Sequence, residues 1–325
     1  MPRVLITTVP FGAIDRASLE ILEDAGFECV LNPYGRRLSE TELVELIPDV
    51  DALVAGTEPI TSRVFNSAPR LRMISRVGVG LDNVDLLAAR RRNLAVAYTP
   101  EAPCEAVAEI TVGLMLCLAR GIHQANSLVH AGQWERILGW RLGDLTIGVI
   151  GVGRIGRKLI DLLSGFGSRV LANDLEPSDL PYAVEWVDKE TLYRRSDVVT
   201  LHVPLTPQTR GLIGTTELGL MKRSAVLVNT SRGGVVDEAS LARALRGREL
   251  RAAAVDVFCD EPYAGELAKL DNCLITCHMG AMAADCRFRM EYGAARNVVH
   301  FFKGESVDQF VPESEYALRH AALRT

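Results

Sequence analysis

The feature that most constrains this chain is a glycine-spaced loop between a predicted strand and a predicted helix. Residues 146–150 form a short apolar run typical of a buried parallel strand, and helical spacing of apolar residues extends over 155–166. Glycines spaced as G-x-G-x-x-G between such elements allow a tight turn, close approach of the backbone to a pyrophosphate, and close packing of helix on strand. The pattern predicts a doubly wound α/β domain that binds a dinucleotide at the helix N-terminus. The predicted contacts are Gly151, Gly153, Arg154, Ile155 and Gly156.

An acidic residue after the next predicted strand distinguishes between the two common dinucleotides. The strand predicted over 169–173 is followed directly by Asp174. A carboxylate at this place accepts hydrogen bonds from the ribose hydroxyls and repels a 2′-phosphate, so we expect NAD rather than NADP. The alternatives are a glycine-rich turn without a ligand and, for Asp174, an ordinary surface carboxylate.

Alternating strands and helices are predicted through most of the chain. Short apolar runs predict strands over 4–7, 28–31, 52–55, 73–76, 94–98, 146–150, 169–173, 198–202, 225–229, 253–257 and 274–276. Helical spacing predicts helices over 17–25, 39–46, 84–91, 103–120, 155–166, 189–195, 215–221, 238–246 and, as the last one, 283–302. The start near Ser39 is supported by a capping-box pattern with Glu42.

This alternation predicts two Rossmann-like doubly wound α/β domains, because helices between strands cover both faces of a parallel sheet. A chain of 325 residues also exceeds the usual size of a single core. We expect a split substrate domain over 1–100 and 286–325, and a NAD-binding domain over 101–285.

Bulk composition argues against several other classes of function. The formal net charge of −5 gives no basic footprint for nucleic acid or for an anionic membrane. The longest apolar run, near 110–119, is too short to span a bilayer. The seven cysteines are odd in number and scattered, which favours a reducing cytoplasm. Cys273, Cys277 and His278 suggest a metal, but no second ligand pair has zinc-finger spacing, so we expect no metal site.

Three polar groups that suit hydroxy-acid chemistry follow predicted strands. Oxidation of an alcohol needs a base for the hydroxyl proton and reduction needs an acid, and histidine serves both near neutral pH. A neighbouring carboxylate favours its protonated form, and an arginine binds a substrate carboxylate through two parallel hydrogen bonds. Arg232, Glu261 and His278 each follow a strand, at the edge where α/β sheets bind ligands. The alternative for each is a structural role.

In this order after the glycine loop, these motifs resemble the D-isomer-specific 2-hydroxyacid dehydrogenase family. The resemblance covers nearly the whole chain and includes residues 201–206 and 76–80. It implies that His278 is the acid/base, that Glu261 polarises it, and that Arg232 holds the substrate carboxylate and carbonyl oxygen. It also implies substrate contacts from the backbone N–H groups of Gly78, Val79 and Gly80, and cofactor contacts from His202, Pro204, Thr209, Thr230, Asp256 and Gly280.

Residues 32–37 and 74–85 most resemble the D-3-phosphoglycerate dehydrogenase branch. This implies that Arg36 and Arg76 meet a second anionic group, although Arg36 and its neighbour Arg37 can equally be ordinary loop charges. Because the chain stops at Thr325, we expect no C-terminal regulatory domain and no allosteric control by serine.

Several alternatives remain open for the substrate and for the type of function. They are reduction of a phosphonate 2-oxo acid such as phosphonopyruvate, reduction of glyoxylate or hydroxypyruvate, oxidation of phosphite, and a non-enzymatic NADH-sensing role like that of a transcriptional corepressor. Residues 121–143, which carry Trp134 and Trp140, resemble the arm through which relatives dimerise, so a homodimer is expected.

Overall fold

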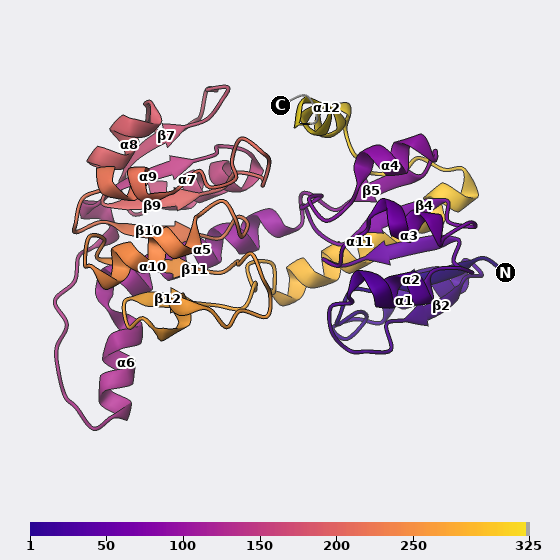
Figure 1. Cartoon of the computed structure of the whole chain (residues 1–325), viewed down its shortest axis with the longest axis horizontal. Helices are drawn as coiled ribbons and strands as arrows, with labels where there is room; N and C mark the ends of the chain where they lie inside the picture. The colour runs from indigo at the N-terminus through magenta and orange to yellow at the C-terminus, as the bar shows by residue number, and fades with distance from the viewer. Residues whose placement is uncertain (323–325) are drawn as a thin grey trace. The chain divides into compact units, whose positions relative to one another are not determined.

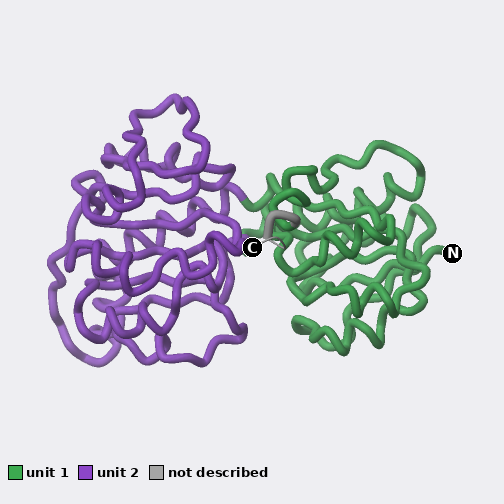
Figure 2. The backbone as a smooth tube through the Cα atoms, turned by 45° about the horizontal axis from the view of Figure 1, so that its top comes forward, with its two compact units in different colours: residues 1–103, 282–325 green, residues 104–281 purple. Residues whose placement is uncertain are grey.

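The computed structural model describes residues 1–322, which form two compact units (Figure 2). Unit 1 comprises Met1–Pro103 and the chain from Met282 onward, and unit 2 comprises Cys104–Ala281. Each unit is an α/β domain with one parallel sheet (Figure 1).

Unit 1 contains a five-stranded sheet in the order β2-β1-β3-β4-β5. Its strands are β1 (Arg3–Ile6), β2 (Glu28–Leu31), β3 (Ala52–Ala55), β4 (Met73–Arg76) and β5 (Ala95–Tyr98). Its helices are α1 (Ala17–Asp24), α2 (Glu40–Leu46), α3 (Ser62–Asn66), α4 (Leu86–Arg91), α11 (Ala284–Lys303) and α12 (Glu313–Ala322). The strand order reverses between β1 and β3, and ligands of open α/β sheets bind at the carboxyl ends of strands beside such a switch point.

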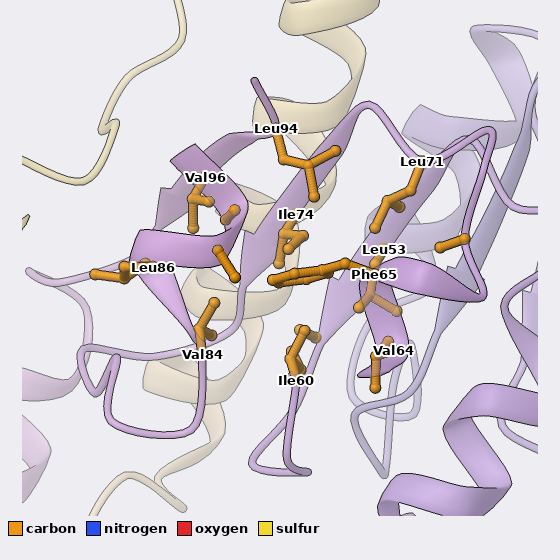
Figure 3. Close-up of a cluster of buried hydrophobic side chains, with 14 of the residues drawn as sticks. Leu53, Ile60, Val64, Phe65, Leu71, Ile74, Val84, Leu86, Leu94 and Val96 are labelled. Atoms are coloured by element: carbon orange, nitrogen blue, oxygen red, sulfur yellow. The ribbon is translucent and has the colours of Figure 1, made fainter. Parts of the chain in front are cut away.

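Both faces of this sheet are covered by helices. Phe65 of α3 packs in a buried cluster with Leu53 and Ile74 of the strands (Figure 3). Because strand side chains alternate, Val54 and Met73 point to the opposite face. Helix α11 contacts β3, β4 and β5 and packs against α1, so these two helices cover that face.

Unit 2 contains a seven-stranded sheet in the order β12-β11-β10-β9-β6-β7-β8. Its strands are β6 (Thr146–Ile150), β7 (Arg169–Asn173), β8 (Val184–Trp186), β9 (Val198–Leu201), β10 (Val226–Asn229), β11 (Ala252–Val255) and β12 (Cys273–Ile275). Its helices are α5 (Pro103–Arg120), α6 (Ile122–His130), α7 (Arg154–Ser164), α8 (Lys189–Arg195), α9 (Thr215–Leu220) and α10 (Glu238–Arg246), with short 3₁₀ turns at Leu142–Asp144 and Glu266–Lys269. The switch point between β6 and β9 lies next to the glycine loop, as in dinucleotide-binding sheets.

The predicted pair of doubly wound parallel sheets is confirmed, but some elements differ from expectation. The prediction that the helix near 283–302 is the last one is wrong, because α12 follows it. Helix α6 was not predicted, and none of its residues is buried, so it has no core-facing stripe to detect. Helix α3 and strand β8 were also not predicted. They have only five and three residues, which is too few to show a clear periodicity of apolar side chains.

Two local expectations can be checked directly. Ser39 accepts a hydrogen bond from the Glu42 backbone and the Glu42 side chain accepts one from the Ser39 backbone, so the predicted capping box is confirmed. In residues 1–322 no single helix is both long and apolar enough to cross a membrane; α5 and α6 meet that criterion of length and composition only as a pair, with a 63° bend at their junction.

Candidate active site

The glycine loop of unit 2 has the geometry that a bound pyrophosphate requires. Gly151 has φ +92°, and a Cβ there would lie 2.6 Å from the His202 carbonyl oxygen, so the turn needs glycine. A Cβ on Gly156 would overlap the Gly151 carbonyl, whereas one on Gly153 would meet nothing within 4 Å. The open space beside Gly153 lies at the start of α7, where backbone N–H groups favour an anion. These residues therefore fit a dinucleotide.

Asp174 is held at the same loop, directly after β7. Its Oδ2 accepts a hydrogen bond of 2.6 Å from the Val152 N–H, which fixes the carboxylate beside the predicted cofactor loop. The side chain is half-buried, so one edge remains accessible to a ribose hydroxyl. A fixed negative charge at this position disfavours a 2′-phosphate.

His202 follows β9 at the switch point of the sheet. Its Nε2 lies 3.0 Å from Thr200 Oγ1, and its Nδ1 is buried without a partner in the described chain. Burial lowers the pKa of His202 to about 4, so the ring is neutral at pH 7. A neutral, enclosed ring is suited to a wall of a binding site rather than to proton transfer.

Other predicted cofactor contacts brace the surrounding loops. Thr209 Oγ1 donates to the Pro204 carbonyl at 2.6 Å, and Thr230 Oγ1 lies 2.9 Å from Thr111 Oγ1 on α5. These threonine hydroxyls therefore hold the loops that follow β9 and β10 in place.

His278 and Glu261 form a close pair at the carboxyl edge of unit 2. His278 Nδ1 lies 2.8 Å from Glu261 Oε2 and 3.1 Å from Oε1. Glu261 also accepts a 3.1 Å hydrogen bond from the Phe258 N–H, which orients the carboxylate. His278 Nε2 makes no hydrogen bond within residues 1–322, and the side chain is 35% exposed. The free nitrogen can therefore exchange a proton with a ligand while the other is held by the carboxylate.

Asp256 holds the loop that carries His278. The Asp256 carboxylate accepts hydrogen bonds from the Met279 N–H and the Gly280 N–H, both at 2.9 Å, and from Thr276 Oγ1 at 2.5 Å. The His278 N–H donates to the Asp256 carbonyl at 2.7 Å. This network supports a left-handed backbone at His278, whose φ is +53°, a conformation that non-glycine residues adopt at a cost. Asp256, which was predicted to contact the cofactor, is almost fully buried. Because it bonds to this loop, it helps to position His278.

Arg232 lies in the loop after β10. Its backbone carbonyl accepts a 3.1 Å hydrogen bond from Asn229 Nδ2, and its Nη1 donates to the Ser231 carbonyl at 2.7 Å. Because β10, β11 and β12 are neighbours in the sheet, the loops carrying Arg232, Glu261 and His278 emerge at one edge of unit 2.

In unit 1 the loop after β4 presents backbone donors. The Gly78 N–H donates to Thr99 Oγ1 at 2.7 Å, so it is already occupied. The N–H groups of Val79 and Gly80 make no hydrogen bond in the described part of the chain. Of the three donors expected from the sequence, two therefore remain available for a carboxylate. Thr99 was not anticipated, although it is the first polar residue after β5.

The two arginines predicted to meet a second anionic group have partners within unit 1. Arg36 forms a bidentate ion pair with Glu42, with Nη2–Oε1 at 2.6 Å and Nη1–Oε2 at 3.0 Å. The Arg36 guanidinium lowers the pKa of Glu42 to about 2. Arg76 is almost fully buried; its Nε donates to Asn83 Oδ1 at 3.3 Å and its Nη1 to the Val77 carbonyl. Both guanidinium groups are thus engaged by the protein itself.

Comparisons with known proteins agree with this geometry. Residues 112–280 match the D-isomer specific 2-hydroxyacid dehydrogenase NAD binding domain. The chain is 38% identical over 320 residues to the D-3-phosphoglycerate dehydrogenase of Methanocaldococcus jannaschii, covering 96% of this chain and 59% of that protein. It is also 38% identical over 277 residues to the glyoxylate reductase of Thermococcus litoralis, covering 81% of this chain and 84% of that protein.

A solved structure shares the fold over nearly the whole chain. It is the TT0316 protein of Thermus thermophilus, which is 35% identical and superposes with a TM-score of 0.88, covering 95% of this chain and all of that one.

Proposed function

This chain belongs to the D-isomer specific 2-hydroxyacid dehydrogenase family, and from that premise we propose that it interconverts a 2-oxo acid and a D-2-hydroxy acid with NAD. The observation that carries the proposal is the pair of His278 and Glu261, held 2.8 Å apart at the strand edge that also carries Arg232. Family membership alone gives the reaction class; this pair supplies the acid/base that the reaction needs.

The roles follow from what each group can donate or accept. When bound at the glycine loop, NADH supplies the hydride. In reduction, His278 Nε2 donates a proton to the substrate carbonyl oxygen, and in oxidation the same nitrogen takes the proton from the hydroxyl. Glu261 holds the imidazole through Nδ1 and so fixes the orientation of the ring. Arg232 binds the substrate carboxylate and stabilises charge on the reacting oxygen. In unit 1, taken by itself, the unoccupied N–H groups of Val79 and Gly80 are donors suited to a carboxylate.

A substrate panel tests this function. Purified protein would be assayed for NADH oxidation at 340 nm with glyoxylate, hydroxypyruvate, 3-phosphohydroxypyruvate and phosphonopyruvate. We expect turnover with at least one of these acids. Tight NADH binding without turnover of any acid would contradict the proposal and favour an NADH sensor, and phosphite-dependent reduction of NAD would indicate the phosphite reaction.

Replacing Asp174 with serine is expected to reduce the preference for NADH over NADPH by about 10-fold or more, because the fixed negative charge that repels the 2′-phosphate is removed. The measurement is kcat/KM for each cofactor at saturating 2-oxo acid. Glu176→Ser, which removes an exposed carboxylate from the same loop, is the matched control. An unchanged cofactor ratio in Asp174→Ser would remove this residue from the cofactor site.

We propose that a second copy of the chain covers the arm formed by residues 121–143. Trp134 is 83% exposed, Leu138 is 94% exposed, and no residue of α6 is buried, so these large apolar side chains are not covered by the residues that the structure describes. Light scattering after size exclusion should give a dimer mass for the wild type and a monomer mass for a Trp134→Glu, Leu138→Glu variant. Leu31→Glu, an exposed leucine of unit 1, serves as control. A monomeric wild type at micromolar concentration would refute the proposal.

A further inference from the structure

The loop after β3 lies directly beside the loop that presents the Val79 and Gly80 donors. The Val77 N–H donates to the Ala55 carbonyl at 2.9 Å, where β3 and β4 end. Asn83 Nδ2 then donates to the Glu58 carbonyl at 2.7 Å and to the Gly56 carbonyl at 3.2 Å. The two loops are therefore tied together at the carboxyl edge of the sheet, next to the β1/β3 switch point.

Arg37 reaches this edge from the loop after β2. Its Nε donates to the carbonyl of Thr57, in the β3 loop, at 3.1 Å. The side chain is exposed, and its two Nη groups make no hydrogen bond or ion pair within the described residues. One bond thus orients the planar guanidinium while its outer edge stays open, which lowers the entropy lost when an anion is bound.

The other arginines of this edge are already engaged. Arg36 is paired with Glu42, and Arg76 is buried against Asn83 and Val77. Arg287, also buried, donates to Glu291 Oε1 at 2.5 Å and to Thr8 Oγ1 at 2.9 Å. In contrast, Arg37 has no acidic partner in the described chain.

From this arrangement we infer that Arg37, and not Arg36 or Arg76, recognises a second anionic group at the far end of the substrate. The chemistry that fits an open guanidinium edge is a tetrahedral phosphorus anion, either a phosphate ester or a phosphonate, bound through two parallel hydrogen bonds. This inference rests on the proposed function, since the Val79 and Gly80 donors in the adjacent loop are taken to hold the carboxylate of the same molecule.

The test uses pairs of acids that differ in the distal group. Hydroxypyruvate is compared with 3-phosphohydroxypyruvate, and pyruvate with phosphonopyruvate, as substrates of the full-length wild type and of Arg37→Met. The wild type should prefer the phosphorus-bearing member of at least one pair. In that pair Arg37→Met should lower kcat/KM for the charged acid by about 10- to 100-fold, chiefly through KM, because a charge-assisted pair is lost. The value for the uncharged partner should change little.

Two further variants separate a binding role from a structural one. Arg36→Met removes the neighbouring guanidinium and should leave the selectivity ratio unchanged, and Arg37→Lys should restore part of the preference because it keeps the charge. Which pair responds distinguishes the phosphate ester from the phosphonate. If the wild type reduces these acids without preferring a charged member, or if Arg37→Met lowers both members equally, the inference fails while the proposed function stands. If no acid is reduced, the proposed function fails, and this inference fails with it.

Discussion

Replacing His278 with glutamine is expected to lower kcat for 2-oxo acid reduction by about 10²–10⁴-fold, the range typical of a lost general acid. Glutamine keeps a polar side chain of similar length but cannot deliver a proton at neutral pH. The Kd for NADH, measured by fluorescence titration, should stay nearly unchanged, because the glycine loop and Asp174 lie at the ends of other strands. The loss should therefore be confined to the chemical step.

His300→Gln is the matched control, since it removes an imidazole from the last turn of α11 in unit 1 and should leave kcat unchanged. If His278→Gln retained wild-type turnover, the acid/base would have to be another group. If it lost NADH binding to the same extent as turnover, His278 would be a residue of the cofactor site instead.

Replacing Arg232 with lysine is expected to lower kcat/KM by about 10²–10³-fold, although the charge is kept. A lysine ammonium offers a point charge and cannot form the two parallel hydrogen bonds of the guanidinium fork. Removal of a single donor to developing negative charge in a transition state typically has an effect of this size. The Asn229 bond to the loop backbone should survive the substitution, because it is made to the carbonyl of residue 232.

The measurement is a steady-state comparison of kcat and KM at saturating NADH. Arg223→Lys, an exposed arginine of unit 2, is the control for a general effect of the substitution. An unaltered kcat/KM in Arg232→Lys would show that this side chain does not touch the substrate.

The parts of this molecule that were predicted from sequence are those governed by short-range patterns. Buried strands are near-continuous apolar runs, so β3, β4, β6 and β7 were predicted with the observed bounds. The glycine spacing and the positions of Arg232, Glu261 and His278 after strands depend on the same local order, because all strands of a parallel sheet end at one edge. Two sheets of this kind could therefore be expected before any contact was known.

The sequence did not show which hydrogen-bond or ion-pair partner each polar group contacts. Thr99 accepts the hydrogen bond of the Gly78 N–H, Glu42 pairs with Arg36, and Asp256 accepts a hydrogen bond from the loop that carries His278. Each of these bonds depends on how the tertiary structure brings the two groups together, so the spacing of residues in the sequence does not predict it. Arg37 illustrates the same point, since the sequence gives it the appearance of an ordinary loop charge, and only its bond to Thr57 places it at the sheet edge.

The configuration of the product tests the central proposal most directly. The wild-type protein would be incubated with NADH and hydroxypyruvate, or with the best three-carbon acid of the substrate panel, and the hydroxy acid analysed by chiral chromatography. From the proposed function we expect the D-enantiomer alone, formed in equal amount to the NADH oxidised and absent in His278→Gln over the same time. Formation of the L-enantiomer, or oxidation of NADH without a hydroxy acid product, would contradict it.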